Sequence, residues 1–252
     1  MAASRAEDRR VERFDSVRLG RLKLVVAASE RDWLLPLLQQ APAGFPGSRT
    51  IAYEGGRGAT RRVETGAHTV VVRASLRGGL PGWFWSTTYL GFAPRVIDEL
   101  AVTSFLRERQ VSVPRPMGAV VQWHAPGLYR SWLATEVVPQ ARSVIQWLEQ
   151  TPAPELREIL AMALGTEVRR MHAAGVSHPD LNLHNILVCG TELPRVTLID
   201  FDRARRSDRP IEDVAGVRSR LLRSAARLDP GGRAVGSDFI EAVASAYEST
   251  PL

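Results

Sequence analysis

The stretch V-S-H-P-D-L-N-L-H-N-I-L-V at residues 176–188, followed after a short turn by R-V-T-L-I-D-F-D-R at residues 195–203, decides the fold. It places Asp180 in a loop, Asn185 five residues later, and Asp200 at the end of an apolar β-type run. The alternative is a buried hairpin whose polar residues only cap turns. The order and interval of the polar residues between two apolar strands favour a chemical site over that alternative.

Phosphoryl transfer from a nucleotide requires a carboxylate that orients a hydroxyl and accepts its proton, and oxygen ligands that hold the metal bridging the phosphates. The pattern H-x-D-x-x-x-x-N followed by D-F-x is typical of the catalytic and metal-binding loops of kinases. We therefore expect Asp180 to act as the catalytic base, and Asn185 and Asp200 to bind Mg²⁺.

Length and composition restrict the class of protein. The chain has 252 residues, is 44% hydrophobic and 24% charged, which fits one large domain or two small lobes that share a cleft. Cys189 is the only cysteine, so no intrachain disulfide forms and a reducing compartment is expected. No apolar stretch reaches the ~18 residues of a membrane span, and the N-terminus lacks the apolar segment of a secretory signal. These features favour a cytoplasmic protein.

The formal net charge of +6 is carried by arginine, since Lys23 is the only lysine. Two explanations stay open: arginine codon usage in a GC-rich genome, and a positive surface that favours nucleotide phosphates or acidic lipids. The sequence contains no Cys/His finger and no concentrated basic run, so we expect no nucleic-acid partner.

The N-terminal half predicts a polar leader at residues 1–20 and then a nucleotide-binding sheet. A glycine-rich loop lies between predicted strands at residues 49–54 and 61–64, ahead of a third at 68–74. Glycines let backbone N–H groups approach phosphates without a Cβ in the way, although such a loop alone is often a plain hairpin turn. The residues expected to contact the ATP phosphates are Gly55, Gly56, Arg57 and Gly58.

Arg73 ends the run V-V-V-R, where a kinase places the lysine that pairs with the phosphates. Arginine keeps the charge but is longer and carries a planar fork of donors. Helical spacing over residues 96–109 makes Glu99 the candidate partner of Arg73, with Asp98 and Glu108 as competitors. Glu136 lies in T-E-V at the expected lobe hinge, where backbone groups meet the adenine.

One further segment leaves two interpretations open. The aromatic stretch at residues 76–95 either packs onto the small lobe or forms a flap in which Trp83 and Tyr89 sit at a membrane interface and Arg95 meets anionic groups. Helices are predicted at residues 143–150, 154–173, 211–228 and 237–247. The third carries an arginine-rich face expected to be exposed, at Arg218, Arg220, Arg223 and Arg227.

Several segments resemble the 3-deoxy-D-manno-octulosonic acid (Kdo) kinases, a family of lipopolysaccharide-core kinases. The matching segments are Y-E-G-G-R-G-A-T, V-V-V-R-A-S-L-R-G-G-L, F-L-R-E-R-Q-V-S-V-P-R-P, H-P-D-L-N-L-H-N-I-L-V and L-I-D-F-D-R, within residues 51–206. The resemblance implies an α+β, protein kinase-like bilobal fold. An antiparallel β lobe with one main helix would occupy residues 21–138, and a mainly helical lobe residues 139–252.

The resemblance also implies a reaction: ATP- and Mg²⁺-dependent phosphorylation of the 4-hydroxyl of Kdo on a lipid A precursor. It implies peripheral contact with the cytoplasmic face of the inner membrane of a Gram-negative bacterium, and no obligate protein partner is evident. By position, Asp180 would be the base, Asn185 and Asp200 the metal ligands, and Arg73 with Glu99 the phosphate-positioning pair.

Two residues depart from the broader protein-kinase pattern. Pro179 replaces the usual arginine of the catalytic loop, and Asp202 replaces the glycine of D-F-G. Asp202 would either bind a second metal or cap a turn. Two other functions stay open: a soluble small-molecule kinase of the aminoglycoside or choline type, and a catalytically silent kinase-like module that binds anionic lipid.

Overall fold

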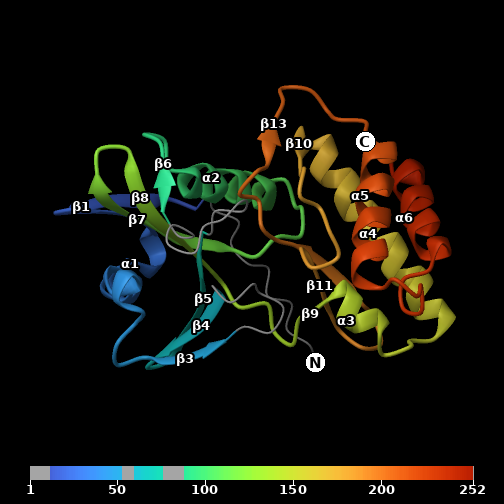
Figure 1. Ribbon diagram of the computed structural model, residues 1–252, viewed down its shortest axis with the longest axis horizontal. Helices are drawn as coiled ribbons and strands as arrows, with labels where there is room; N and C mark the ends of the chain where they lie inside the picture. The colour runs from blue at the N-terminus through green and yellow to red at the C-terminus, as the bar shows by residue number, and fades with distance from the viewer. Residues whose placement is uncertain (1–11, 53–59, 76–87, 252) are drawn as a thin grey trace, which may run out of the picture.

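The computed structural model describes residues 12–52, 60–75 and 88–251, which form two lobes (Figure 1). The N-terminal lobe is built on an antiparallel eight-stranded sheet of order β1-β2-β7-β8-β5-β4-β3, with β6 paired to β8. Its strands are β1 (Phe14–Leu19), β2 (Leu22–Ala27), β3 (Arg49–Ala52), β4 (Thr60–Thr65), β5 (His68–Ala74), β6 (Tyr89–Leu90), β7 (Pro116–Ala125) and β8 (Leu128–Thr135). Its helical segments are η1 (Ala28–Glu30), α1 (Arg31–Gln39), η2 (Ala41–Ala43) and α2 (Arg95–Glu108).

The two faces of this sheet carry different helices. Val70 and Val72 of β5 pack in one apolar cluster with Leu34 and Leu38 of α1. Because side chains alternate along a strand, Arg73 lies on the opposite face, which α2 covers. The strand pattern V-V-V-R therefore directs the only cation of β5 toward α2.

The C-terminal lobe is mainly helical. It contains α3 (Val144–Leu148), α4 (Pro154–Ala173), α5 (Val214–Leu228), α6 (Ser237–Ser249) and the short strands β9 (Arg142–Ser143), β10 (Val176–Ser177), β11 (Ile186–Cys189), β12 (Arg195–Leu198) and β13 (Arg205–Arg206). Its core also takes in Val102 and Leu106 of α2. Helix α2 thus packs against both lobes, and Figure 1 shows it running from the sheet toward the helical lobe. Among the described residues, no helix has the length and apolarity to span a membrane.

The leader predicted at residues 1–20 is wrong for its second half. Phe14–Leu19 is strand β1, paired along its length with β2 from Phe14 opposite Ala27 to Leu19 opposite Leu22. Gly20, with a φ of 57°, makes the tight turn between the two strands. The strand shows no clean alternation of buried and exposed residues, so its sequence lacks the pattern that identifies a half-buried strand.

Part of the two loops singled out in the sequence lies outside the described residues. Those positions are Gly55, Gly56, Arg57 and Gly58 of the glycine-rich loop, and Trp83 of the aromatic stretch. Tyr89 is described and is 8% exposed, with its ring stacked on Tyr129 at a centroid distance of 5.6 Å. For Tyr89, internal packing is therefore the correct interpretation.

Candidate active site

The loop that carries Asp180 is fixed to the strand end that carries Asp200. His178 is 1% exposed, and its Nε2 lies 3.0 Å from the carbonyl oxygen of Ile199. Burial lowers the pKa of His178, so the ring is neutral and its proton lies on Nε2, which donates to that carbonyl. The ring also packs on Phe201 at 4.9 Å. The histidine of the motif therefore holds the two loops together.

Two asparagines shape the loop around Asp180. The side-chain amides of Asn182 and Asn185 donate to the carbonyl oxygen of Asp180, at 2.8 and 3.0 Å. The backbone N–H of Leu183 donates to the hydroxyl of Ser224 on α5 at 3.1 Å. Because its amide nitrogen is engaged, Asn185 keeps its side-chain oxygen for another ligand.

Asp200 adopts a backbone conformation that non-glycine residues rarely take, with a φ of 69°. The N–H of the preceding Ile199 donates to the carbonyl oxygen of Asn185 at 3.0 Å, which draws the two segments together. The side-chain oxygens of Asn185 and Asp200 are hard donors of the kind that Mg²⁺ prefers, and Mg²⁺ uses few protein ligands besides water and phosphate. The donor set therefore fits Mg²⁺.

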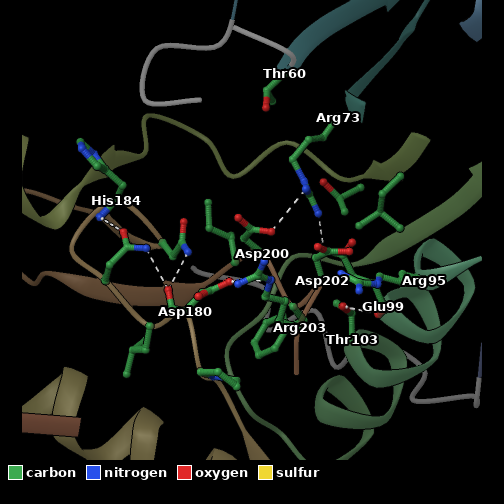
Figure 2. Close-up of a pocket in the computed structure, with 18 of the residues that line it drawn as sticks. Thr60, Arg73, Arg95, Glu99, Thr103, Asp180, His184, Asp200, Asp202 and Arg203 are labelled. Atoms are coloured by element: carbon green, nitrogen blue, oxygen red, sulfur yellow. Dashed lines mark hydrogen bonds and ion pairs between the residues drawn. The ribbon is translucent and has the colours of Figure 1, made fainter. Parts of the chain in front are cut away.

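Arg73 links two carboxylates across the lobes. Its Nη2 lies 2.5 Å from Oε1 of Glu99, and its Nη1 lies 3.3 Å from Oδ1 of Asp200 (Figure 2). The side chain of Glu99 is 1% exposed, whereas Asp98 and Glu108 are exposed. Burial raises the pKa of Glu99 to about 7, against the opposing effect of Arg73. The structure thus selects Glu99 among the three candidate partners.

Glu136 lies at the hinge and is tied to Arg115. The N–H of Arg115 donates to Oε1 of Glu136 at 2.6 Å, and the N–H of Glu136 donates to the carbonyl oxygen of Arg115 at 2.9 Å. The Arg115 guanidinium also binds Glu12 at 2.9 Å and Glu30 at 2.8 Å. The N–H of Glu136 is therefore engaged, and a nucleotide base would meet this residue at its carbonyl oxygen.

One cleft of about 1240 Å³ brings these residues together. Its lining includes every predicted site residue that the structure describes: Arg73, Glu99, Glu136, Asp180, Asn185 and Asp200. Figure 2 shows Arg73 reaching from the sheet side toward Asp200 and Glu99, with Asp180 across the cleft. The arrangement can hold a metal-bound polyphosphate at Arg73, Asn185 and Asp200, with Asp180 lining the same cleft.

The cleft also contains residues that the sequence did not assign to the site. Nε of Arg203 lies 3.5 Å from Oδ2 of Asp180. Asp202 faces the cleft with Arg95, and burial raises its pKa. Its Oδ1 is buried without a hydrogen-bond partner among the described residues, so this oxygen caps no turn within them.

The arginine-rich face of α5 is only partly as predicted. Arg218 is exposed and paired with Glu241, as a solvated face requires. Arg223 and Arg227 are also exposed, Arg220 is half-buried, and all three line the cleft. Their spacing of three and four residues puts them on one side of a helix, and this was the signal in the sequence that could have separated them from Arg218.

Comparisons with known proteins agree with this geometry. A family model described as the lipopolysaccharide kinase (Kdo/WaaP) family matches residues 48–242. A Vibrio cholerae protein named 3-deoxy-D-manno-octulosonic acid kinase is 38% identical over 157 residues, which are 59% of this chain and 62% of that protein. A Photobacterium profundum protein of the same name is 37% identical over 186 residues, which are 69% of this chain and 76% of that protein.

A solved structure titled WaaP in complex with acyl carrier protein shares the fold. Its TM-score is 0.58 at 18% identity, with 90% of this chain and 89% of that chain covered. The chain spans less than two thirds of the length of the Vibrio cholerae relative. The family match extends over most of the chain, from the third strand of the sheet into the last helix. The protein therefore belongs to the lipopolysaccharide kinase (Kdo/WaaP) family.

Proposed function

We propose that the protein is a kinase that transfers the γ-phosphoryl group of ATP to the 4-hydroxyl of Kdo on a lipid A precursor. The observation that carries this proposal is the meeting of Asp180, Asn185, Asp200, Arg73 and Glu99 in one cleft. The name that the relatives share, 3-deoxy-D-manno-octulosonic acid kinase, supports the choice of acceptor.

The residues divide the reaction between them. Asp180 would orient the acceptor hydroxyl and take its proton while the hydroxyl oxygen bonds to the γ-phosphorus and the bond to the bridging oxygen of ADP breaks. Asn185 and Asp200 would hold Mg²⁺, which when bound neutralises phosphate charge. Arg73, positioned by Glu99, would pair with the phosphates from the sheet side. Catalysis would rest on positioning and electrostatics.

We further propose that the protein works at the cytoplasmic face of the inner membrane, in peripheral contact with the lipid. The net charge of +6 favours an anionic surface, and Leu90 and Phe92 are 77% and 81% exposed beside the cleft-lining Tyr89. Sedimentation with vesicles that contain anionic lipid tests this. Binding that is lost with neutral vesicles is expected, and equal binding to both would contradict an electrostatic contact.

The test of the reaction is transfer of labelled γ-phosphate from Mg-ATP to Kdo-lipid A precursor in detergent micelles. We expect label on this acceptor, none on the same lipid without Kdo, and none on an acceptor with 4-deoxy-Kdo. Asp180→Ala should lower the rate by about 10²- to 10⁴-fold with little change in nucleotide affinity. Asp208→Ala, which removes an exposed carboxylate outside the cleft, is the matched control. Full activity of Asp180→Ala would refute the role of the base.

A further inference from the structure

Helix α5 presents cations to the cleft that also contains Asp180 and Arg73. Arg220, Arg223 and Arg227 all line the cleft, while Arg218 of the same helix does not. Residues three and four apart lie on one side of a helix, so the three guanidinium groups share one stripe. The stripe is therefore part of the cleft lining, with Arg223 and Arg227 exposed toward solvent and Arg220 half-buried.

The stripe is held against the catalytic loop. Ser224 is 4% exposed, and its hydroxyl accepts the N–H of Leu183, which lies three residues after Asp180. Arg223 immediately precedes Ser224, and Arg227 follows it by three residues. This contact holds α5 against the loop that carries Asp180, and a group bound by Arg223 and Arg227 would lie in the same cleft as that carboxylate.

Two charges of the stripe, those of Arg223 and Arg227, are not paired with a carboxylate of the described residues as Arg73 is. Arg73 is shared between Glu99 and Asp200. Arg223 donates to the hydroxyl of Ser219, and neither Arg223 nor Arg227 has a carboxylate partner within residues 12–52, 60–75 and 88–251.

Arg220, the third member of the stripe, lies about one helical turn before Arg223. Its Nη2 binds Asp213 at 3.1 Å, and its Nε is buried with no acceptor in the described part of the chain. A buried charged donor without an acceptor, such as this Nε, is costly unless a ligand supplies the acceptor. Arginine binds carboxylates and phosphates through two donors at once. The stripe therefore has the chemistry of an anion site.

We propose that Arg223 and Arg227, backed by Arg220, bind an anionic group of the acceptor and so place its hydroxyl at Asp180. This inference rests on the proposed function, because it takes the acceptor to lie beside Asp180. The anion is a carboxylate or a phosphate, and both occur on such an acceptor: the carboxylate on the Kdo sugar and the phosphates on the lipid A disaccharide.

Binding measured by calorimetry tests the assignment without turnover. The full-length protein, saturated with Mg²⁺ and a non-hydrolysable ATP analogue, is titrated with free Kdo, with the methyl ester of Kdo, and with lipid A bisphosphate lacking Kdo in micelles. The variant is Arg223→Ala/Arg227→Ala. The control is Arg209→Ala/Arg218→Ala, which removes the same charge at exposed positions outside the cleft. Affinity for the ATP analogue reports whether each variant retains its fold.

We expect the Arg223→Ala/Arg227→Ala protein to bind one anion about tenfold to a hundredfold more weakly than wild type, while the control binds as wild type does. A loss seen with free Kdo, matched by weak binding of the methyl ester to wild type, assigns the site to the carboxylate. A loss seen with the lipid that lacks Kdo assigns it to a phosphate. If the variant binds both anions within twofold of wild type, or wild type binds neither, the inference is wrong.

The binding experiment and the transfer assay can fail separately, so they distinguish the anion site from the proposed reaction. Arginine-dependent binding of Kdo without phosphoryl transfer would leave the anion site standing and remove the proposed reaction. Transfer that is equally efficient in wild type and in Arg223→Ala/Arg227→Ala, with an unchanged KM for the acceptor, would leave the reaction standing and remove the anion site.

Discussion

Replacing Arg73 by lysine is predicted to lower the proposed kinase activity, although lysine is the residue that kinases place at this position. Arg73 uses two different nitrogens, Nη2 for Glu99 at 2.5 Å and Nη1 for Asp200 at 3.3 Å. A lysine has a single nitrogen on a shorter side chain, so it can serve one carboxylate well but not both. The sheet and α2 are spaced for the longer side chain.

The size of the effect follows from the lost contact. A hydrogen bond to a charged group contributes about 1.5–3 kcal/mol, which corresponds to about 10- to 150-fold in rate. We expect Arg73→Lys to lower kcat/KM for ATP by this factor in the transfer assay. Arg130→Lys, at an exposed position on the neighbouring strand β8, should leave kcat/KM unchanged. If Arg73→Lys keeps kcat/KM within twofold of wild type, the bridging geometry does not matter for function.

Three further predictions concern packing, pH and the catalytic loop. Gly165→Ala should lower the free energy of unfolding by about 1–3 kcal/mol, seen as a lower Tm, because a Cβ there would lie 2.5 Å from the carbonyl oxygen of Val243 and outweigh the gain in helix propensity. Burial lowers the pKa of His172 from 6.5 to about 4. Between these pH values the unfolded chain binds more protons than the folded protein, so about 3 kcal/mol of folding stability is lost as the pH falls from 6.5 to 4. Denaturant unfolding should show this loss in wild type and a smaller one in His172→Gln; equal pH dependence would contradict it. Ser224→Ala should leave the buried N–H of Leu183 without its acceptor and lower kcat more than it raises KM for ATP, whereas a change confined to KM would show that the contact does not position the loop.

Local sequence patterns were sufficient to predict the segments whose own residues dictate their structure. The apolar stripe at residues 154–173 predicted helix α4 with its observed bounds, and Gly175, with a φ of 75°, ends it ahead of the catalytic loop. Motif spacing placed Asp180, Asn185 and Asp200 in one cleft. The loop with Asp180 and Asn185 leads into β11, Asp200 follows β12, and these two strands are paired.

Contacts between distant segments could not be derived from the sequence. Arg203 and Arg115 look like ordinary surface arginines in the sequence, and only the folded chain brings Arg203 to Asp180 and Arg115 to Glu12. The exposed face expected for α5 is confirmed for Arg218, Arg223 and Arg227, while Arg220 is half-buried, and helix periodicity alone could not show that three of the four line the cleft. Strand β1 was missed for the same reason, because its pairing with β2 defines it and the sequence does not show that contact.

The position of β1 has a practical consequence for anyone who shortens the chain for expression. A protein that begins at residue 21 would lose β1 and leave β2 as an unpaired, largely buried edge. Such an edge is a template for pairing with another molecule, so self-association and precipitation are the expected result. The same cut removes Glu12, which binds Arg115 beside the hinge at Glu136. An affinity tag is therefore better attached beyond helix α6, at the opposite end of the chain from this contact.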